Sequence, residues 1–220
     1  RVLDTIEADY RAALAVESRE APRYLATVAE AARAAGLNDR AEQSYLEFQT
    51  TFPDSAYGFR ELGILYREQG RLAEAQNVLE QATVVSPRNT DAWIALGEVY
   101  LNQSLLLEAE QTLDTIYRLD PLSARLYELR ADLHRQQGHL VEAADALRQS
   151  LVIEESIPSR LALADLYRQL KQPEAAIEQC TAAADALFAT WPRLLDPELW
   201  QIGRCLAQSD TLPSQPEICN

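Results

Sequence analysis

The sequence predicts an all-α protein built from stacked helical hairpins, and three observations support this. The same pattern occurs twice at an interval of 34 residues, as Phe59 and Trp93 illustrate. Within each copy the apolar residues fall in two runs at helical spacing. A proline closes each copy, where its missing donor stops the second helix. The matching positions are Phe59, Leu62, Gly63, Tyr66, Ala75, Leu79, Ala82 and Pro87, then Trp93, Leu96, Gly97, Tyr100, Ala109, Leu113, Ile116 and Pro121.

Each copy is predicted to form two antiparallel helices joined by a short turn. In the first copy the helical runs span roughly residues 57–69 and 72–85, and Gly70 lies between them. Gly63 and Ala75 fall where the two helices would cross. Because these residues carry little or no side chain, the two backbones can approach closely.

The order of an aromatic residue, Leu-Gly, Tyr, Ala, Leu, Ala and Pro at this period resembles the tetratricopeptide repeat (TPR) family. The resemblance covers about residues 22–190. It implies a right-handed superhelical solenoid in which the first helix of every repeat lines a concave groove. It also implies that ligands contact the second, fifth, ninth and twelfth residues of each repeat.

The repeat register divides the chain in order. Residues 1–21 are expected to form a second-helix half repeat, and residues 22–190 five full repeats. A linker and a C-terminal capping helix follow at 191–208, then an extended or disordered tail at 209–220. The five repeats are 22–55, 56–89, 90–123, 124–156 and 157–190. Atypical end units are typical of solenoids, because the last apolar face has to be covered.

The first half unit is predicted to be one helix over Val2–Ser18, with Ala8, Ala12 and Ala15 at its small core positions. The last two repeats depart from the pattern. His134 replaces the aromatic residue in the fourth repeat. The fifth repeat has no closing proline, so its second helix is expected to run on toward Trp191.

Composition limits the class of partner. The 220-residue chain carries a net charge of -14, which argues against a nucleic-acid backbone or an anionic membrane as the main partner, since both reward clustered Lys and Arg. The sequence has no apolar run long enough to span a bilayer, so we expect a soluble protein, with the cytoplasm slightly favoured over the periplasm. The absence of an initiator Met indicates a piece of a longer protein.

The sequence predicts no enzyme, cofactor or metal site. It contains no glycine-rich phosphate loop, no cysteine pair at metal spacing and no nucleophile motif. His134 and His139 are five residues apart, so one helix would not aim both at a single metal ion. Cys180 falls at a helical core position, and Cys205 and Cys219 flank a proline-containing tail. We expect thiols rather than disulfides, because a disulfide requires an oxidising compartment.

The groove positions implied by the resemblance show a contrast between repeats. In three repeats the ninth and twelfth residues are an acid and an arginine, which are expected to pair on their own helix. These pairs are Glu30 with Arg33, Asp132 with Arg135, and Asp165 with Arg168. In the second and third repeats Ile64 and Leu101 interrupt the pattern, so Arg67 and Glu98 lose the same-helix partner.

We therefore predict a partner-binding groove centred on the second and third repeats. Its residues are Tyr57, Arg60, Ile64, Arg67, Asp91, Ile94, Glu98, Leu101 and Arg125. An apolar strip beside arginine forks suits a protein or peptide that carries a bulky apolar anchor and a carboxylate. Some members of the family clamp a C-terminal carboxylate with Lys and Asn at the fifth and ninth positions. This chain has Arg60 and Ile64 there in the second repeat, so chaperone-tail binding is not supported.

The predicted function is a non-catalytic protein-protein interaction scaffold that holds a partner segment in the groove. Two alternatives remain open. One is a self-assembling module that forms a homo-oligomer, and the other is an accessory repeat domain of a larger enzyme or secretion assembly. An RNA-reading repeat is disfavoured, because such arrays need a basic groove.

Overall fold

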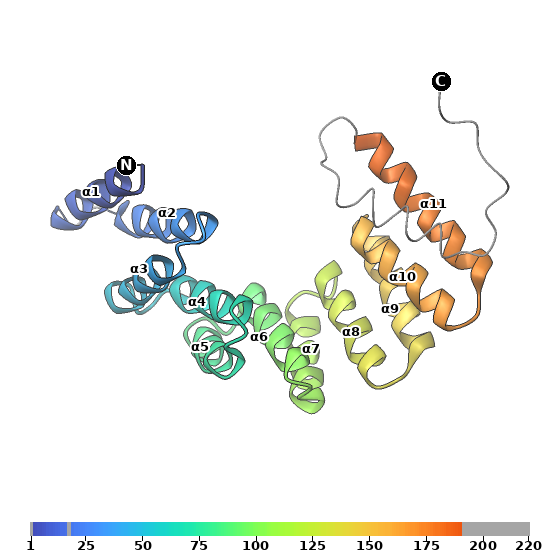
Figure 1. The fold of residues 1–220 in the computed structure, drawn as a ribbon. Helices are drawn as coiled ribbons and strands as arrows, with labels where there is room; N and C mark the ends of the chain where they lie inside the picture. Colours follow the sequence, from blue (N-terminus) through green and yellow to red (C-terminus); the bar gives the residue numbers. More distant parts are fainter. Residues whose placement is uncertain (1, 17–18, 191–220) are drawn as a thin grey trace, which may run out of the picture. The chain divides into compact units, whose positions relative to one another are not determined.

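The computed structural model describes residues 2–16 and 19–190, and over these residues it consists of helices without strands (Figure 1). The helices are α1 (Val2–Ala15), α2 (Ala21–Ala34), α3 (Asn38–Thr51), α4 (Ala56–Glu68), α5 (Leu72–Val85), α6 (Thr90–Asn102), α7 (Leu106–Leu119), α8 (Ala124–Gln136), α9 (Leu140–Ile153), α10 (Ile157–Gln169) and α11 (Pro173–Thr190). From α2 onward they pack in successive pairs, α2 with α3 through α10 with α11. The prediction of an all-α helical repeat fold is confirmed.

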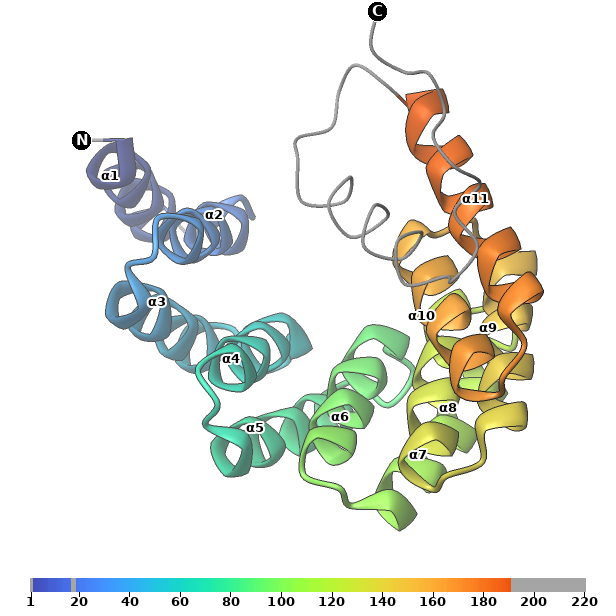
Figure 2. The same ribbon diagram turned by 45° about the vertical axis from the view of Figure 1, so that its right-hand side comes forward.

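The chain forms two compact units where the sequence analysis treated the repeats as one continuous array. Unit 1 spans Arg1–Leu119 and contains α1 to α7, and unit 2 spans Asp120–Asn220 and contains α8 to α11. The boundary falls just after α7, four residues before the end of the expected third repeat. Within unit 1, α2, α4 and α6 follow one another along one side, and α3 and α5 lie along the other (Figure 2).

The first helix of each pair ends in the same left-handed turn. The residues with positive φ are Gly36, Gly70, Ser104, Gly138 and Lys171, one in each pair. In the second pair the Gly70 N–H donates to the Arg67 carbonyl (2.9 Å) and the Arg71 N–H donates to the Tyr66 carbonyl (2.8 Å). These two hydrogen bonds satisfy carbonyls of the last helical turn and reverse the chain. The turn therefore fixes the hairpin geometry of every repeat.

Side-chain caps set the start of four first helices, whereas α2 begins without one. The Ser55 hydroxyl accepts a hydrogen bond from the Tyr57 N–H, and the Asn89 amide oxygen accepts one from the Ala92 N–H. Ser123 and Ser156 cap α8 and α10 in the same way. Because the first N–H groups of a helix have no partner within it, these caps define where α4, α6, α8 and α10 begin.

Gly63 lies at a close helix crossing, as the repeat pattern predicts. A Cβ atom added at Gly63 would lie 2.4 Å from Cγ of Leu79 on α5. Leu79 is fully buried, at 0% exposure. Gly63 thus faces the side chain of Leu79. Because Leu79 is buried and cannot move aside, there is no room for a larger residue at position 63.

The core register predicted for the first helix is wrong. α1 ends at Ala15, and it buries Tyr10 and Ala13, whereas Ala8, Ala12 and Ala15 are exposed. Tyr10 packs in one cluster with Leu25 and Phe48, and its hydroxyl donates to Glu47 of α3 (2.9 Å). The buried face of α1 therefore carries the large aromatic side chain of Tyr10, and the three alanines lie on its exposed face. The alanine spacing alone gave no sign of this.

The last described helix, α11, runs from Pro173 to Thr190. The second helix of the fifth repeat therefore continues toward Trp191, as expected. Cys180 is buried in α11 and takes part in a disulfide, which contradicts the expectation of a thiol there. Cys205, Cys219, the predicted capping helix at 197–208 and the tail at 209–220 lie outside the described residues. Within residues 2–16 and 19–190, no helix combines the length and the apolar character needed to cross a membrane.

Candidate interaction groove

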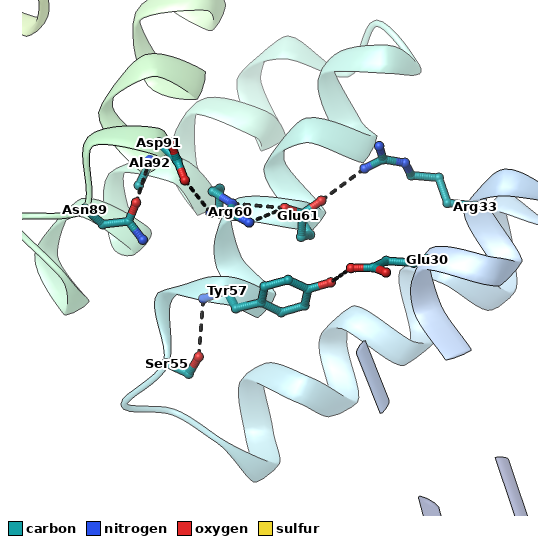
Figure 3. A network of polar contacts seen from close by, with 9 residues as sticks. All are labelled: Glu30, Arg33, Ser55, Tyr57, Arg60, Glu61, Asn89, Asp91 and Ala92. Carbon is teal, nitrogen blue, oxygen red and sulfur yellow. Dashed lines mark hydrogen bonds and ion pairs between the residues drawn. The ribbon is translucent and has the colours of Figure 1, made fainter. Parts of the chain in front are cut away.

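The helices α2, α4 and α6 present one face of unit 1, called here the first-helix face, and a network of polar contacts runs across it (Figure 3). The Tyr57 hydroxyl of α4 donates a hydrogen bond to Glu30 of α2. The Tyr57 ring packs against Phe48, with 5.0 Å between the ring centroids. Burial, followed by the hydrogen bond to Glu30, raises the pKa of Tyr57. Tyr57 therefore stays a neutral donor that links the first two repeats.

Arg60 occupies the centre of the network. Its Nε and Nη2 atoms donate to Oε1 of Glu61 at 2.9 and 2.7 Å, and its Nη1 donates to Oδ2 of Asp91 on α6 at 3.2 Å (Figure 3). Glu61 also accepts a hydrogen bond from Nη1 of Arg33 on α2 at 3.1 Å. One carboxylate thus bridges two arginines from neighbouring repeats. The guanidinium of Arg60 in turn bridges Glu61 and Asp91.

The expectation that Arg67 and Glu98 are left for a partner is wrong. Arg67 of α4 and Glu98 of α6 form an ion pair with each other, and their side chains are only 24% and 13% exposed. The repeat register places the twelfth residue of one repeat beside the ninth residue of the next. The pairs expected from the sequence lie on one helix, whereas this contact joins two helices.

The predicted pair of Glu30 with Arg33 is also not the one observed. Arg33 pairs with Glu61 (3.1 Å) and with Glu68 (3.7 Å), both on α4, while Glu30 accepts from Tyr57. The first-helix face of unit 1 is therefore crosslinked between repeats by polar contacts.

A hollow of about 360 Å³ lies in this face between α4 and α6. Ile64, Ile94 and Ala95 form its apolar part, and the charged pairs surround them. Ile64 and Ile94 are partly exposed, and Ala95 is buried. The lining residues are Arg60, Glu61, Ile64, Arg67, Asp91, Ile94, Ala95 and Glu98. A volume of this size is at the lower end of the roughly 300–1,000 Å³ typical of ligand pockets.

The structure brings six of the nine predicted groove residues to this hollow. They are Arg60, Ile64, Arg67, Asp91, Ile94 and Glu98. Tyr57 belongs to the polar network but does not line the hollow. Leu101 is only 4% exposed, so its assignment to a partner-contacting surface is wrong. Arg125 belongs to unit 2, where it pairs with Glu128 on its own helix (2.6 Å).

Sequence reasoning missed Glu61, the carboxylate that joins Arg33 to Arg60. Glu61 is the sixth residue of its repeat, outside the four positions that the family resemblance implies for ligand contact. Its position directly after Arg60 was the available signal, although adjacent residues on a helix do not usually face each other. The long arginine side chain spans that separation here.

The corresponding positions in unit 2 behave as predicted. Asp132 pairs with Arg135 on α8 (2.7 Å), and Asp165 pairs with Arg168 on α10 (3.2 Å). These acids and arginines are bound on their own helices, and the two acids are more exposed than Glu98. The two units thus use the same residue types in different ways.

Unit 2 has its own hollow, of about 460 Å³, against α8 and α9. Its apolar residues are prominently exposed, with Leu122 at 73% and Val152 at 87%. The lining residues are Leu122, Tyr127, Asp145, Arg148, Gln149, Val152 and Ile153. Exposed apolar surface of this kind marks many protein-protein contacts. Among the described residues, no three His, Cys, Asp or Glu side chains are placed to hold a metal ion.

Residues 60–124 and 107–160 match one family model described as tetratricopeptide repeat, and residues 157–186 match another of the same description. The matches together cover more than half of the chain. No curated protein matches the sequence significantly.

Solved structures of similar fold include two that are described as TPR proteins. A TPR protein from Thermus thermophilus is 21% identical with a TM-score of 0.72, over 85% of this chain and 100% of that one. A tetratricopeptide repeat protein from Parabacteroides merdae is 20% identical with a TM-score of 0.71, over 94% of this chain and 78% of that one. MamA from Desulfovibrio magneticus is 16% identical with a TM-score of 0.64, over 77% of this chain and 97% of that one.

At these identities the solved structures establish the fold alone, a helical repeat solenoid. Repeats of this kind generally mediate protein-protein interaction and are typically non-catalytic. The matched repeat models, together with the paired helices and the recurring turns of both units, show that the chain belongs to the tetratricopeptide repeat family.

Proposed function

We propose that this chain is a non-catalytic protein-protein interaction scaffold that holds a segment of a partner protein against the first-helix face of unit 1. The observation that carries the proposal is the hollow between α4 and α6, where Ile64 and Ile94 stay partly exposed inside a frame of charged pairs. A partner side chain seated there would bury both isoleucines. The charged frame would exclude water from the contact, as the rims of protein interfaces do.

The charged pairs also preorganise the hollow for binding. Glu61 is held by Arg33 and Arg60, and Glu98 is held by Arg67, so the charged side chains around the apolar floor are already ordered. A surface that is ordered before binding loses less side-chain entropy when a partner arrives. We therefore expect a partner residue with an aliphatic side chain as the anchor.

The sequence analysis also predicted a carboxylate on the partner, because Arg60 and Arg67 were expected to be available. Both arginines contact carboxylates of this chain instead. The reason for expecting a partner carboxylate is therefore removed.

Selection from a peptide library tests the proposal without a known partner. A phage-displayed library of random short peptides is panned against the wild-type protein, and the selected peptides are titrated into wild type and Ile94→Gln by calorimetry. We expect Ile94→Gln to weaken binding by roughly tenfold or more, the loss typical of a central anchor contact. Val84→Gln is the matched control, because Val84 is 78% exposed on α5 and does not line the hollow.

Two results decide the outcome. Equal affinity of the selected peptides for wild type and Ile94→Gln would show that the hollow is not the binding site. Equal losses in Ile94→Gln and Val84→Gln would show the same. Circular dichroism spectra and melting temperatures of both variants establish that each is folded before binding is compared.

Self-assembly is the second candidate, and the exposed apolar hollow of unit 2 favours it. Val152 and Leu122 would be removed from water if a second copy covered them. Light scattering over a range of concentrations tests this: association that Val152→Asp abolishes supports it. A monomer at every concentration rejects it.

A further inference from the structure

We infer that the partner segment carries a lysine or arginine next to its apolar anchor, and that Asp91 binds this positive charge. The inference rests on the proposed function, because it concerns the same hollow. It replaces the expectation of a carboxylate beside the partner's apolar anchor.

The arginines of the hollow are already engaged by carboxylates of this chain. Arg60 uses Nε and Nη2 for Glu61 and Nη1 for Asp91. Arg67 pairs with Glu98. A partner carboxylate would have to displace one of these carboxylates and leave it in the hollow without its cation. Such a displaced, partly buried charge is costly.

Among the three acids that line the hollow, Asp91 is the most exposed. Its side chain is 73% exposed, against 12% for Glu61 and 13% for Glu98. Among residues 2–16 and 19–190 it accepts one side-chain hydrogen bond, the 3.2 Å contact with Arg60. A carboxylate has two oxygens with about four acceptor positions, so Asp91 can accept from a second cation without releasing Arg60.

The charge of the surrounding surface favours the same partner. The polar network of the first-helix face contains five carboxylates, Glu30, Glu61, Glu68, Asp91 and Glu98, and three arginines, Arg33, Arg60 and Arg67. The whole chain carries a net charge of -14. A basic segment is attracted to such a surface and an acidic one is repelled, which affects the association rate most strongly.

The spacing on α6 relates the charge to the anchor. Asp91 and Ile94 are three residues apart on one helix and therefore lie on the same face. A peptide that places an aliphatic side chain on Ile94 would bring a neighbouring lysine or arginine to Asp91. The expected recognition element is thus short, an aliphatic residue with a basic residue beside or near it.

The panned phage library gives the first test. Peptides selected by the wild-type protein should be enriched in Lys and Arg near an aliphatic residue, relative to the unselected library. Selected peptides enriched in Asp and Glu, or with no enrichment in basic residues, would overturn the inference.

Titration of one selected basic peptide gives the second test. Asp91→Asn should weaken binding by roughly two- to fivefold at low salt, the range of an exposed ion pair, and less at high salt. Asp39→Asn is the matched control, because Asp39 is exposed and, like Asp91, is the second residue of a helix in unit 1. Equal affinities in Asp91→Asn and wild type would overturn the inference.

The two proposals fail in different ways. If acidic peptides are selected and Ile94→Gln weakens their binding, the hollow remains the site and only the charge inference is wrong. If selected peptides of any charge bind Ile94→Gln as well as wild type, the proposed function itself is wrong.

Discussion

Arg67 on α4 and Glu98 on α6 form an ion pair that joins the first helices of two neighbouring repeats. Both side chains are largely shielded from water, whereas Arg135 and Asp132 form an exposed pair on a single helix in unit 2. In unit 1 the arginine and the acid thus join two repeats. In unit 2 they lie on the surface of a single helix. This difference changes what substitution of Arg67 should do.

Arg67→Glu should destabilise unit 1, because it leaves Glu98 beside a like charge in a shielded position. The expected loss is about 1–3 kcal/mol in the free energy of unfolding, the cost of an unsatisfied buried polar or charged group. Urea unfolding followed by circular dichroism measures it. Arg135→Glu is the control and should cost less than about 1 kcal/mol, as exposed pairs do. Equal losses in the two variants would contradict the difference between the pairs.

Gly63→Leu should also destabilise the protein, because the new side chain would overlap Leu79 of α5. A Cβ atom alone would approach Leu79 Cγ to 2.4 Å. Overpacking of this kind costs about 1–3 kcal/mol. A double-mutant cycle with Leu79→Ala checks the cause, since the double variant should lose less stability than the two single losses added together. Strict additivity would show that Leu79 is not the obstacle.

Ser104→Gly and Lys171→Gly should each stabilise the protein. Both residues hold the left-handed turn position with φ near 57° and 58°, where the other three repeats have glycine. A non-glycine residue in this conformation costs roughly 1–2 kcal/mol, so relief of part of this strain should raise the melting temperature. Gly70→Ala, at the equivalent position, should lower it. Opposite signs for the two kinds of change are the decisive result in thermal unfolding.

Glu42 should make the stability of unit 1 sensitive to acid. Its hydrogen bond from Arg71 is the main reason why the pKa of Glu42 lies below the ordinary value of 4.5, and the Tyr66 hydroxyl adds to the effect. The folded pKa is lowered, so ionised Glu42 stabilises the fold above the unfolded pKa. This contribution is lost as pH falls through the folded pKa.

Melting temperatures measured from neutral pH down to below about 4.5, the ordinary glutamate pKa, test this expectation for Glu42. The acid-induced decrease should be smaller in Glu42→Gln than in wild type. Glu110→Gln provides the control, because Glu110 is an exposed glutamate on α7. Parallel pH profiles for wild type and Glu42→Gln would count against the prediction.

The repeat pattern was sufficient to predict the fold, and the candidate groove positions came from the resemblance to the TPR family. The small residue at Gly63 and the helical spacing of apolar side chains act within one hairpin, and the 34-residue period repeats that hairpin along the chain, so all three can be recognised in the sequence. The same register placed Ile64 and Ile94 on the first helices, where the structure shows them beside one hollow.

Only the tertiary structure decided which charges pair and which side chains are available to a partner. Arg67 finds Glu98 on the next first helix, Glu61 joins two arginines, and Leu101 is buried. Tyr10 likewise takes the core position that the alanines of α1 were expected to fill. Each of these outcomes depends on the distance between side chains of different repeats. The stacking of the helices sets that distance, whereas the helical spacing of residues in the sequence describes only the faces of one helix.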